Sequence, residues 1–152
     1  GRAGGVTVRR PTVRVERLEG RAELPLPARA TPGSAGFDVA AAESADLVRG
    51  RVDLVGTGLR MRPPAGSFLE MRPRSGLSSR GVIMVNAPGT IDRDYSGEIK
   101  VPLTYLFDGS YRIQVGDRIG QIRLVDDRPA RFALGRVRPV ATRRGGFGST
   151  GR

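Results

Sequence analysis

The residues best suited to chemistry lie between Asn86 and Lys100, in the stretch NAPGTIDRDYSGEIK. Asp92 and Asp94 supply carboxylates here, and Tyr95 supplies a flat ring. A carboxylate can act as a general base toward water, and an aromatic ring can hold a small substrate. Asp and Gly are also frequent in turns for conformational reasons alone, so this stretch by itself does not define a site.

Three other segments contain residues that suit phosphate binding. Asp38 falls in a short strand pattern, where Asp is disfavoured; it could bond nearby backbone or face a phosphate-bound metal. Residues 72–81, RPRSGLSSRG, favour a short helical turn whose N–H groups face an anion. The stretch 141–152, ATRRGGFGSTGR, has the composition of a mobile segment, yet its glycines, hydroxyls and arginines could clamp a phosphate.

Two residue types are missing from the 152-residue chain, which contains no cysteine and no histidine. Disulfides, thiolate chemistry, zinc fingers and Ser-His-Asp triads are therefore excluded. Catalysis must use Asp, Glu, Ser, Tyr or Arg, and a bound metal must be a hard, oxygen-liganded ion such as Mg²⁺.

The chain is strongly basic, with a formal net charge of +11 and arginine at all but one of its 26 basic positions. This charge favours polyanionic ligands, either nucleic acid or nucleotide phosphates, and arginine suits bidentate phosphate recognition. Aromatic residues make up only 5% of the chain, which argues against a stacking platform for single strands.

Short alternating runs separated by turns dominate a sequence with 22 glycines and 11 prolines. They predict one all-β domain, a barrel or sandwich. We expect a loose tail at 1–11, a β domain at 12–140 and a Gly-rich arm at 141–152, with a last strand at 133–140. No apolar run is long enough to span a bilayer, so we expect a cytoplasmic protein without membrane contacts.

Turn signals at Pro88-Gly89 and Ser96-Gly97 are followed by strand-like alternation over 99–107. This pattern predicts a β-hairpin with Asp92, Asp94 and Tyr95 near its bend.

Five segments, in chain order, together resemble the trimeric dUTPase family. They are PGSAGFD around Asp38, PRSGLSSRG around Arg74 and Ser75, NAPGTIDRDYSGE with Asp92 and Tyr95, GDRIGQI with Gln121, and GGFGSTG around Phe147. One such motif is common in proteins, whereas five in register over residues 12–151 are specific.

The resemblance implies a distorted jelly-roll, β-barrel-like fold with at most one short helix, assembled as a homotrimer with shared active sites. The C-terminal arm of one subunit would close over a site formed by the others. The implied reaction is Mg²⁺-assisted hydrolysis of dUTP to dUMP and pyrophosphate, which limits uracil in DNA and supplies dUMP for dTMP synthesis. No specific nucleic acid partner is expected.

The resemblance also implies roles for particular residues. Asp92 would activate the water that attacks the α-phosphorus, and Asp38 would hold Mg²⁺ through water. Arg74, Ser75 and Gln121 would complete the catalytic set by stabilising charge on the phosphates. The implied substrate-binding residues are Arg74, Ser75, Gly76, Asn86, Gly89, Thr90, Ile91, Asp92, Tyr95, Lys100, Gln121, Arg143, Arg144, Phe147, Gly148 and Ser149.

Three positions depart from the family pattern. Thr142 stands where the last motif usually has Arg, so Arg143 or Arg144 would have to contact the γ-phosphate. Ser96 stands where Arg often follows the Tyr, and Gly120 stands where Ala is common.

Two alternatives stay open at this point. A dCTP deaminase shares the fold but uses a glutamate base in the strand after the hairpin, and residues 99–107 contain no carboxylate. A nucleic-acid-binding β domain would account for the +11 charge and would bind DNA in a salt-sensitive manner without Asp92.

Overall fold

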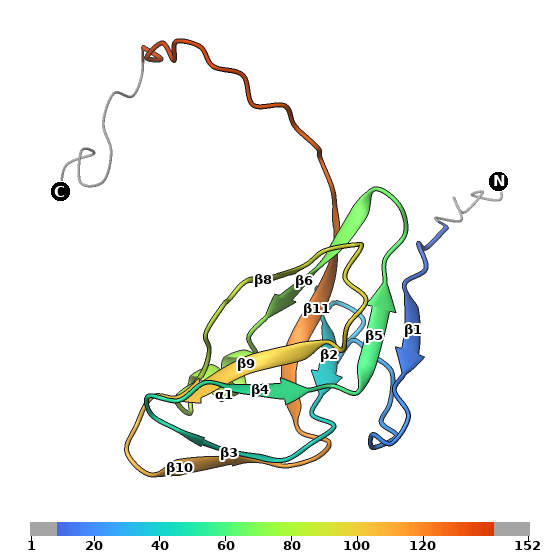
Figure 1. Ribbon diagram of the computed structural model, residues 1–152, viewed down its shortest axis with the longest axis vertical. Helices are drawn as coiled ribbons and strands as arrows, with labels where there is room; N and C mark the ends of the chain where they lie inside the picture. The colour runs from blue at the N-terminus through green and yellow to red at the C-terminus, as the bar shows by residue number, and fades with distance from the viewer. Residues whose placement is uncertain (1–8, 142–152) are drawn as a thin grey trace, which may run out of the picture.

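The computed structural model describes residues 9–141, whose regular secondary structure is almost entirely antiparallel β-strand (Figure 1). Within these residues the one helix is the single turn α1 (Ser75–Ser78), and no helix is long and apolar enough to cross a membrane. The strands are β1 (Arg14–Arg17), β2 (Phe37–Ala40), β3 (Ala45–Val48), β4 (Asp53–Gly56), β5 (Leu59–Arg62), β6 (Ser67–Arg72), β7 (Val82–Met84), β8 (Gly89–Ile91), β9 (Lys100–Tyr105), β10 (Ser110–Ile113) and β11 (Arg118–Asp126).

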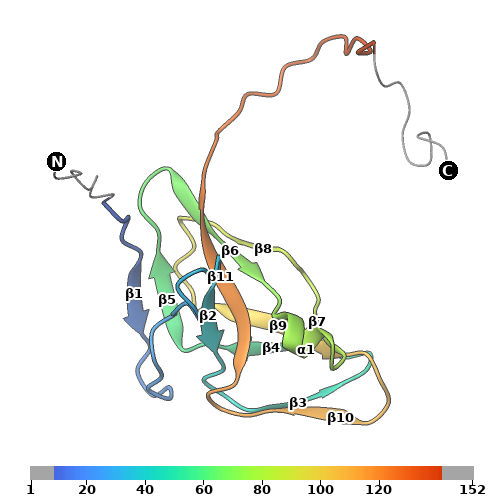
Figure 2. The same cartoon turned by 180° about the vertical axis from the view of Figure 1, so that it is seen from behind.

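The strands pair in a nested order that runs inward from both ends of the domain. β2 pairs with β11, β3 with β10 and β4 with β9, so segments far apart in sequence lie side by side (Figures 1 and 2). β6 and β8 extend the β2–β11 pair, β7 extends β9, and β1 pairs with β5. Nested antiparallel pairing is typical of a jelly roll, which confirms the predicted fold class.

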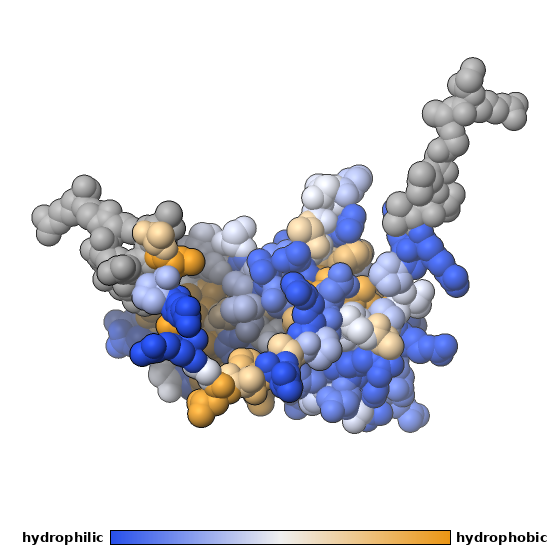
Figure 3. Space-filling view, turned by 90° about the horizontal axis from the view of Figure 1, so that it is seen from above, coloured by the Kyte–Doolittle hydropathy of each residue, from blue (hydrophilic) through white to orange (hydrophobic). Residues whose placement is uncertain are grey.

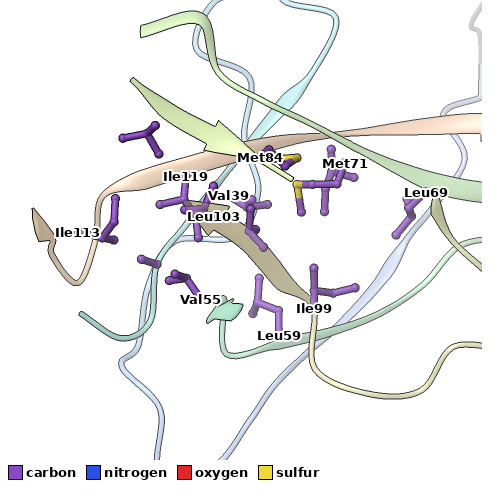
Figure 4. Close-up of a cluster of buried hydrophobic side chains, with 14 of the residues drawn as sticks. Val39, Val55, Leu59, Leu69, Met71, Met84, Ile99, Leu103, Ile113 and Ile119 are labelled. Carbon is purple, nitrogen blue, oxygen red and sulfur yellow. The ribbon is translucent and has the colours of Figure 1, made fainter. Parts of the chain in front are cut away.

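One hydrophobic cluster fills the space between the sheets (Figure 4). In β6, Leu69 and Met71 are buried while the residues between and beyond them are more exposed, and β9 buries Val101 and Leu103 in the same way. Successive strand residues point to opposite faces, so this period-two pattern turns one face of each sheet toward the core. Each large aliphatic side chain buried there contributes about 1.5–3 kcal/mol, which fixes the sheets that carry the functional loops.

The predicted hairpin over residues 86–107 is wrong. β8 pairs with β6, whereas β9 pairs with β4 and β7, so the two strands belong to different sheets. The alternation at 99–107 reflects burial of one face of β9 and does not identify its pairing partner. Residues 92–99 therefore form a crossing between two sheets and not the bend of a two-stranded hairpin.

The chain beyond β11 leaves the body of the domain (Figure 1). Residues 133–140, predicted as the last strand, form none, and Phe132, Leu134 and Val137 are more than nine-tenths exposed. This prediction is wrong because these apolar residues find no sheet to pack against within residues 9–141.

Hydrophilic side chains cover much of the surface seen from above (Figure 3). Many arginines pair with carboxylates, for example Arg49 with Asp108 at 2.8 Å and Arg112 with Asp46 at 2.9 Å. Exposed pairs of this kind contribute about 0–1 kcal/mol each, so the stability of the domain rests mainly on its core.

Candidate functional site

Residues from the stretch Asn86 to Lys100 line much of an open cleft of about 300 Å³, here named the loop pocket. Its lining is largely apolar and includes hydroxyl, amide and charged side chains. This combination is typical of small-molecule sites, and the volume lies at the lower end of their usual range. The lining residues are Leu54, Met71, Asn86, Gly89, Thr90, Ile91, Asp92, Tyr95, Glu98, Ile99, Lys100 and Pro102.

Hydrogen bonds fix the crossing loop that forms one wall of the loop pocket. The carbonyl of Asp92 accepts the Tyr95 N–H at 3.1 Å, and the Tyr95 hydroxyl donates to the Glu98 carbonyl at 2.8 Å. The carbonyl of Ile99 accepts a bond from the Thr57 hydroxyl at 2.7 Å, which anchors the end of the loop to the core. The loop therefore holds an exposed carboxylate and a half-exposed aromatic ring on the same wall.

A second, more polar pocket of about 180 Å³ is here named the arginine pocket. It lies where the turn before β2, the start of α1 and strand β11 meet. A carboxylate, a guanidinium, hydroxyls and an amide converge in it. Its lining residues are Ala30, Ser34, Gly36, Asp38, Arg74, Ser75, Gly76 and Gln121.

Strand register brings the polar groups of the arginine pocket together. Gln121 on β11 lies opposite Asp38 on β2 and opposite Arg72 on β6, so their side chains share one face of the sheet. Asp38 accepts ion pairs from Arg74 Nε at 3.2 Å and from Arg118 Nη1 at 3.4 Å. The Gln121 amide donates to the Pro73 carbonyl at 3.0 Å, so the pocket is assembled before any ligand enters.

Met71 of the loop pocket and Gln121 of the arginine pocket stand on opposite faces of the four-stranded sheet. Met71 points into the core and lines the loop pocket. Arg72 follows it and points the other way, toward the face where its cross-strand partner Gln121 lines the arginine pocket. The pockets share no lining residue.

Metal binding by protein side chains alone has little support in the described part of the chain. Residues 9–141 contain no group of three His, Cys, Asp or Glu side chains that could hold an ion. Asp38 is the one carboxylate of the arginine pocket, and two arginines already pair with it. An ion at this place would need most of its oxygen ligands from a bound molecule.

A network of three charged side chains supports the loop pocket. Arg21 pairs with Glu43 at 3.0 Å through Nη1 and with Glu98 at 2.8 Å through Nη2. The Gly56 N–H donates to the other carboxylate oxygen of Glu43 at 2.8 Å. The Gly56 amide foremost, and then Arg21, hold the pKa of Glu43 below its ordinary value.

This shift predicts a pH-dependent contribution to stability. A carboxyl whose pKa falls on folding stabilises the fold above its ordinary pKa of 4.5, and the contribution is lost as the pH falls below that value. Glu43→Gln should cost about 1 kcal/mol at pH 7, a modest figure because the side chain is partly exposed. Thermal unfolding from pH 3 to 7 tests this, and a wild-type advantage that persists unchanged at pH 3 would contradict it.

The structure sorts the predicted residues into two groups. Asn86, Gly89, Thr90, Ile91, Asp92, Tyr95 and Lys100 line the loop pocket, while Asp38, Arg74, Ser75, Gly76 and Gln121 line the arginine pocket. The motifs did not predict this division, and they gave no role to Glu98 or Arg118. Both residues stand within quoted motifs, but nothing in their spacing shows that they pair with Arg21 and Asp38. Arg143, Arg144, Phe147, Gly148 and Ser149 lie outside the described residues.

The described residues form a jelly-roll domain with two pockets lined by residues of the quoted motifs. The family model described as dUTPase matches residues 22–151. Deoxyuridine 5'-triphosphate nucleotidohydrolases of Brucella melitensis and Caulobacter vibrioides are each 44% identical to this chain over 147 residues. These matches cover 93% and 91% of this chain, respectively, and 94% of each relative. The chain belongs to the dUTPase family, which confirms the resemblance carried by the five motifs.

Solved structures give the same result. The dUTPase of Staphylococcus bacteriophage 80alpha with dUpNHpp has a TM-score of 0.77 and 25% identity, covering 92% of this chain and 98% of that chain. The dUTPase of Streptococcus mutans has a TM-score of 0.72 and 26% identity, covering 78% of this chain and 98% of that chain.

Proposed function

We propose that the protein hydrolyses dUTP to dUMP and pyrophosphate, with a base and sugar in the loop pocket and phosphates in an arginine pocket. The observation that carries this proposal is the meeting of Asp92 and Tyr95 on one wall of a nucleoside-sized cleft. Family membership supports the substrate, since the relatives that match this chain are named for the same nucleotide. The reaction would remove dUTP before it enters DNA and supply dUMP for dTMP synthesis.

In this proposal the loop pocket recognises deoxyuridine. Uracil would meet main-chain groups at Asn86 and from Gly89 to Ile91, where a close-fitting backbone leaves no room for the thymine methyl group. The Tyr95 ring would pack under the deoxyribose and oppose a ribose 2′-hydroxyl. Asp92 would orient and deprotonate the water that attacks the α-phosphorus in line.

The arginine pocket would bind the triphosphate as its magnesium complex. The phosphates bring most of the oxygen ligands that Mg²⁺ requires, and Asp38 would contribute through bound water. Arg74, Ser75 and Gln121 would stabilise negative charge as pyrophosphate leaves. Asp38 holds Arg74 in place through the 3.2 Å ion pair, which supports a preorganised pocket.

We further propose a homotrimer in which each active site combines the loop pocket of one subunit with the arginine pocket of another. The separate lining of the two pockets supports this division. An apolar face supports the assembly: Leu54, Val85 and Leu106 are each more than half exposed on or beside the β4–β9–β7 sheet, whose outer face also carries Pro102. Exposed apolar surface of this kind is typical of a subunit interface. An arm from residue 141 onward would close the site.

Pyrophosphate release from dUTP, dCTP, dTTP and UTP in the presence of Mg²⁺ tests the function. Release from dUTP alone is the expected result. Ammonia release from dCTP would instead favour a deaminase, and salt-sensitive DNA binding without any turnover would favour the nucleic-acid alternative.

The proposed role of Tyr95 makes a prediction about sugar selectivity. Tyr95→Ala should lower the preference for dUTP over UTP, expressed as the ratio of kcat/KM values, by about tenfold or more because the ring no longer fills the space of a 2′-hydroxyl. Tyr95→Phe keeps the ring and loses the bond to the Glu98 carbonyl, so its effect should be smaller. An unchanged ratio in Tyr95→Ala would remove this role.

A further inference from the structure

Arg21 lies far from the catalytic motifs in sequence, yet a continuous chain of contacts leads from it to the sugar-facing wall of the loop pocket. Its Nη2 pairs with the Glu98 carboxylate at 2.8 Å. The backbone carbonyl of the same Glu98 accepts the Tyr95 hydroxyl bond at 2.8 Å. Glu98 therefore links the two residues: its carboxylate contacts the Arg21 guanidinium, and its backbone carbonyl holds the Tyr95 hydroxyl.

The surroundings of this ion pair show how closely it is fitted. The Glu98 side chain is only 12% exposed, so its carboxylate depends on Arg21 for compensation. A side chain at Gly56 would collide with both Arg21 and Glu98, so the pair occupies space that only glycine leaves open. The two terminal nitrogens of Arg21 contact carboxylates, whereas its Nε is buried without a hydrogen-bond partner among the described residues. An unpaired buried N–H of this kind is unfavourable for folding.

Buried ion pairs contribute little net stability, but removal of one partner leaves an uncompensated buried charge that is strongly unfavourable. Without Arg21, the Glu98 carboxylate has to turn toward water. Such a turn would displace the carbonyl that holds the Tyr95 hydroxyl. The ring would then be free to leave its position on the pocket wall.

We propose that Arg21 is a positioning residue for nucleotide selection. Through Glu98 it holds Tyr95 where the ring discriminates deoxyribose from ribose. This inference rests on the proposed dUTP hydrolysis, and it adds a specificity determinant from the segment between β1 and β2, outside all five motifs.

The competing explanation is that Arg21 only stabilises the fold. Substitution of Glu43 distinguishes this explanation from a positioning role. Glu43→Gln weakens the same network but leaves the Arg21–Glu98 contact intact, so it should lower stability and keep the dUTP preference. Arg49→Met removes an arginine from the surface pair with Asp108 and serves as a remote control.

The experiment measures kcat/KM for dUTP and UTP in full-length wild type, Arg21→Met, Glu43→Gln and Arg49→Met. Arg21→Met should lower the dUTP/UTP ratio about tenfold, and the two controls should keep the wild-type ratio. Arg21→Lys, which can keep one carboxylate contact, should restore part of the ratio. If Arg21→Met does not fold, Glu98→Gln weakens the same ion pair with less disturbance and should lower the ratio in the same direction.

Amide hydrogen exchange gives a readout that does not depend on turnover. Exchange across residues 95–99 should be faster in Arg21→Met and unchanged in Arg49→Met. A wild-type ratio together with wild-type exchange in Arg21→Met would overturn the proposal. An equal loss of the dUTP/UTP ratio in Glu43→Gln would also overturn the proposal, because general destabilisation would then account for the loss in both variants. Failure of wild type to hydrolyse dUTP would instead remove the proposed function, while the exchange experiment would still test the contact chain.

Discussion

Asp92→Asn should reduce dUTP hydrolysis by about 10²–10⁴-fold in kcat, the usual contribution of a general base. The substitution preserves the size and shape of the side chain, and the backbone turn in which the Asp92 carbonyl accepts the Tyr95 N–H does not involve the carboxylate. The loop should therefore keep its conformation while losing a group that can take a proton from water. Steady-state pyrophosphate release measures the loss, and binding of a non-hydrolysable dUTP analogue should stay close to wild type.

Asp94→Asn provides a matched control in the same loop. Asp94 is an exposed carboxylate two residues away and does not line the loop pocket. Its neutralisation changes the charge of the loop by the same amount but leaves the pocket wall intact. Wild-type turnover in Asp94→Asn and severe loss in Asp92→Asn would assign the effect to the position of one carboxylate. Substantial dUTP hydrolysis by Asp92→Asn would reject it as the base.

Local sequence patterns predicted much of the fold. Alternation in β6 and β9 survives in the structure because each strand buries one face, and the turn of α1 falls inside the predicted segment 72–81. Pairing partners were not predictable in this way. β8 and β9 are neighbours in sequence, but their partners come from strands elsewhere in the chain, and alternation alone cannot specify a distant partner.

The segment 133–140 illustrates a different limit. It was predicted as a strand and contains several apolar residues, yet Leu134 and Val137 are fully or almost fully exposed in the single chain. A sequence pattern can indicate that a face of a segment will be buried, but it does not identify the chain that buries it. The same limit applies to the site, where Asp92 and Arg74 were predicted together but line two separate pockets of the chain.

Mixed trimers should recover activity that neither parent variant has, if active sites are shared between subunits. Arg74→Ala removes a guanidinium from the arginine pocket and should strongly reduce turnover, as Asp92→Asn does through the loop pocket. In a ring of three subunits containing both variants, only one site joins an intact loop pocket to an intact arginine pocket. Mixed trimers isolated with two different affinity tags should therefore show about one-third of wild-type activity.

The control for the mixing experiment is Asp92→Asn combined with the double variant Asp92→Asn, Arg74→Ala. These mixed trimers have no intact loop pocket in any subunit, so they should stay inactive whatever the arrangement. If each site instead used both pockets of one chain, the first mixture would also stay inactive, because every subunit in it carries a lesion. Recovery in the first mixture alone would show that each site joins the loop pocket of one subunit to the arginine pocket of another.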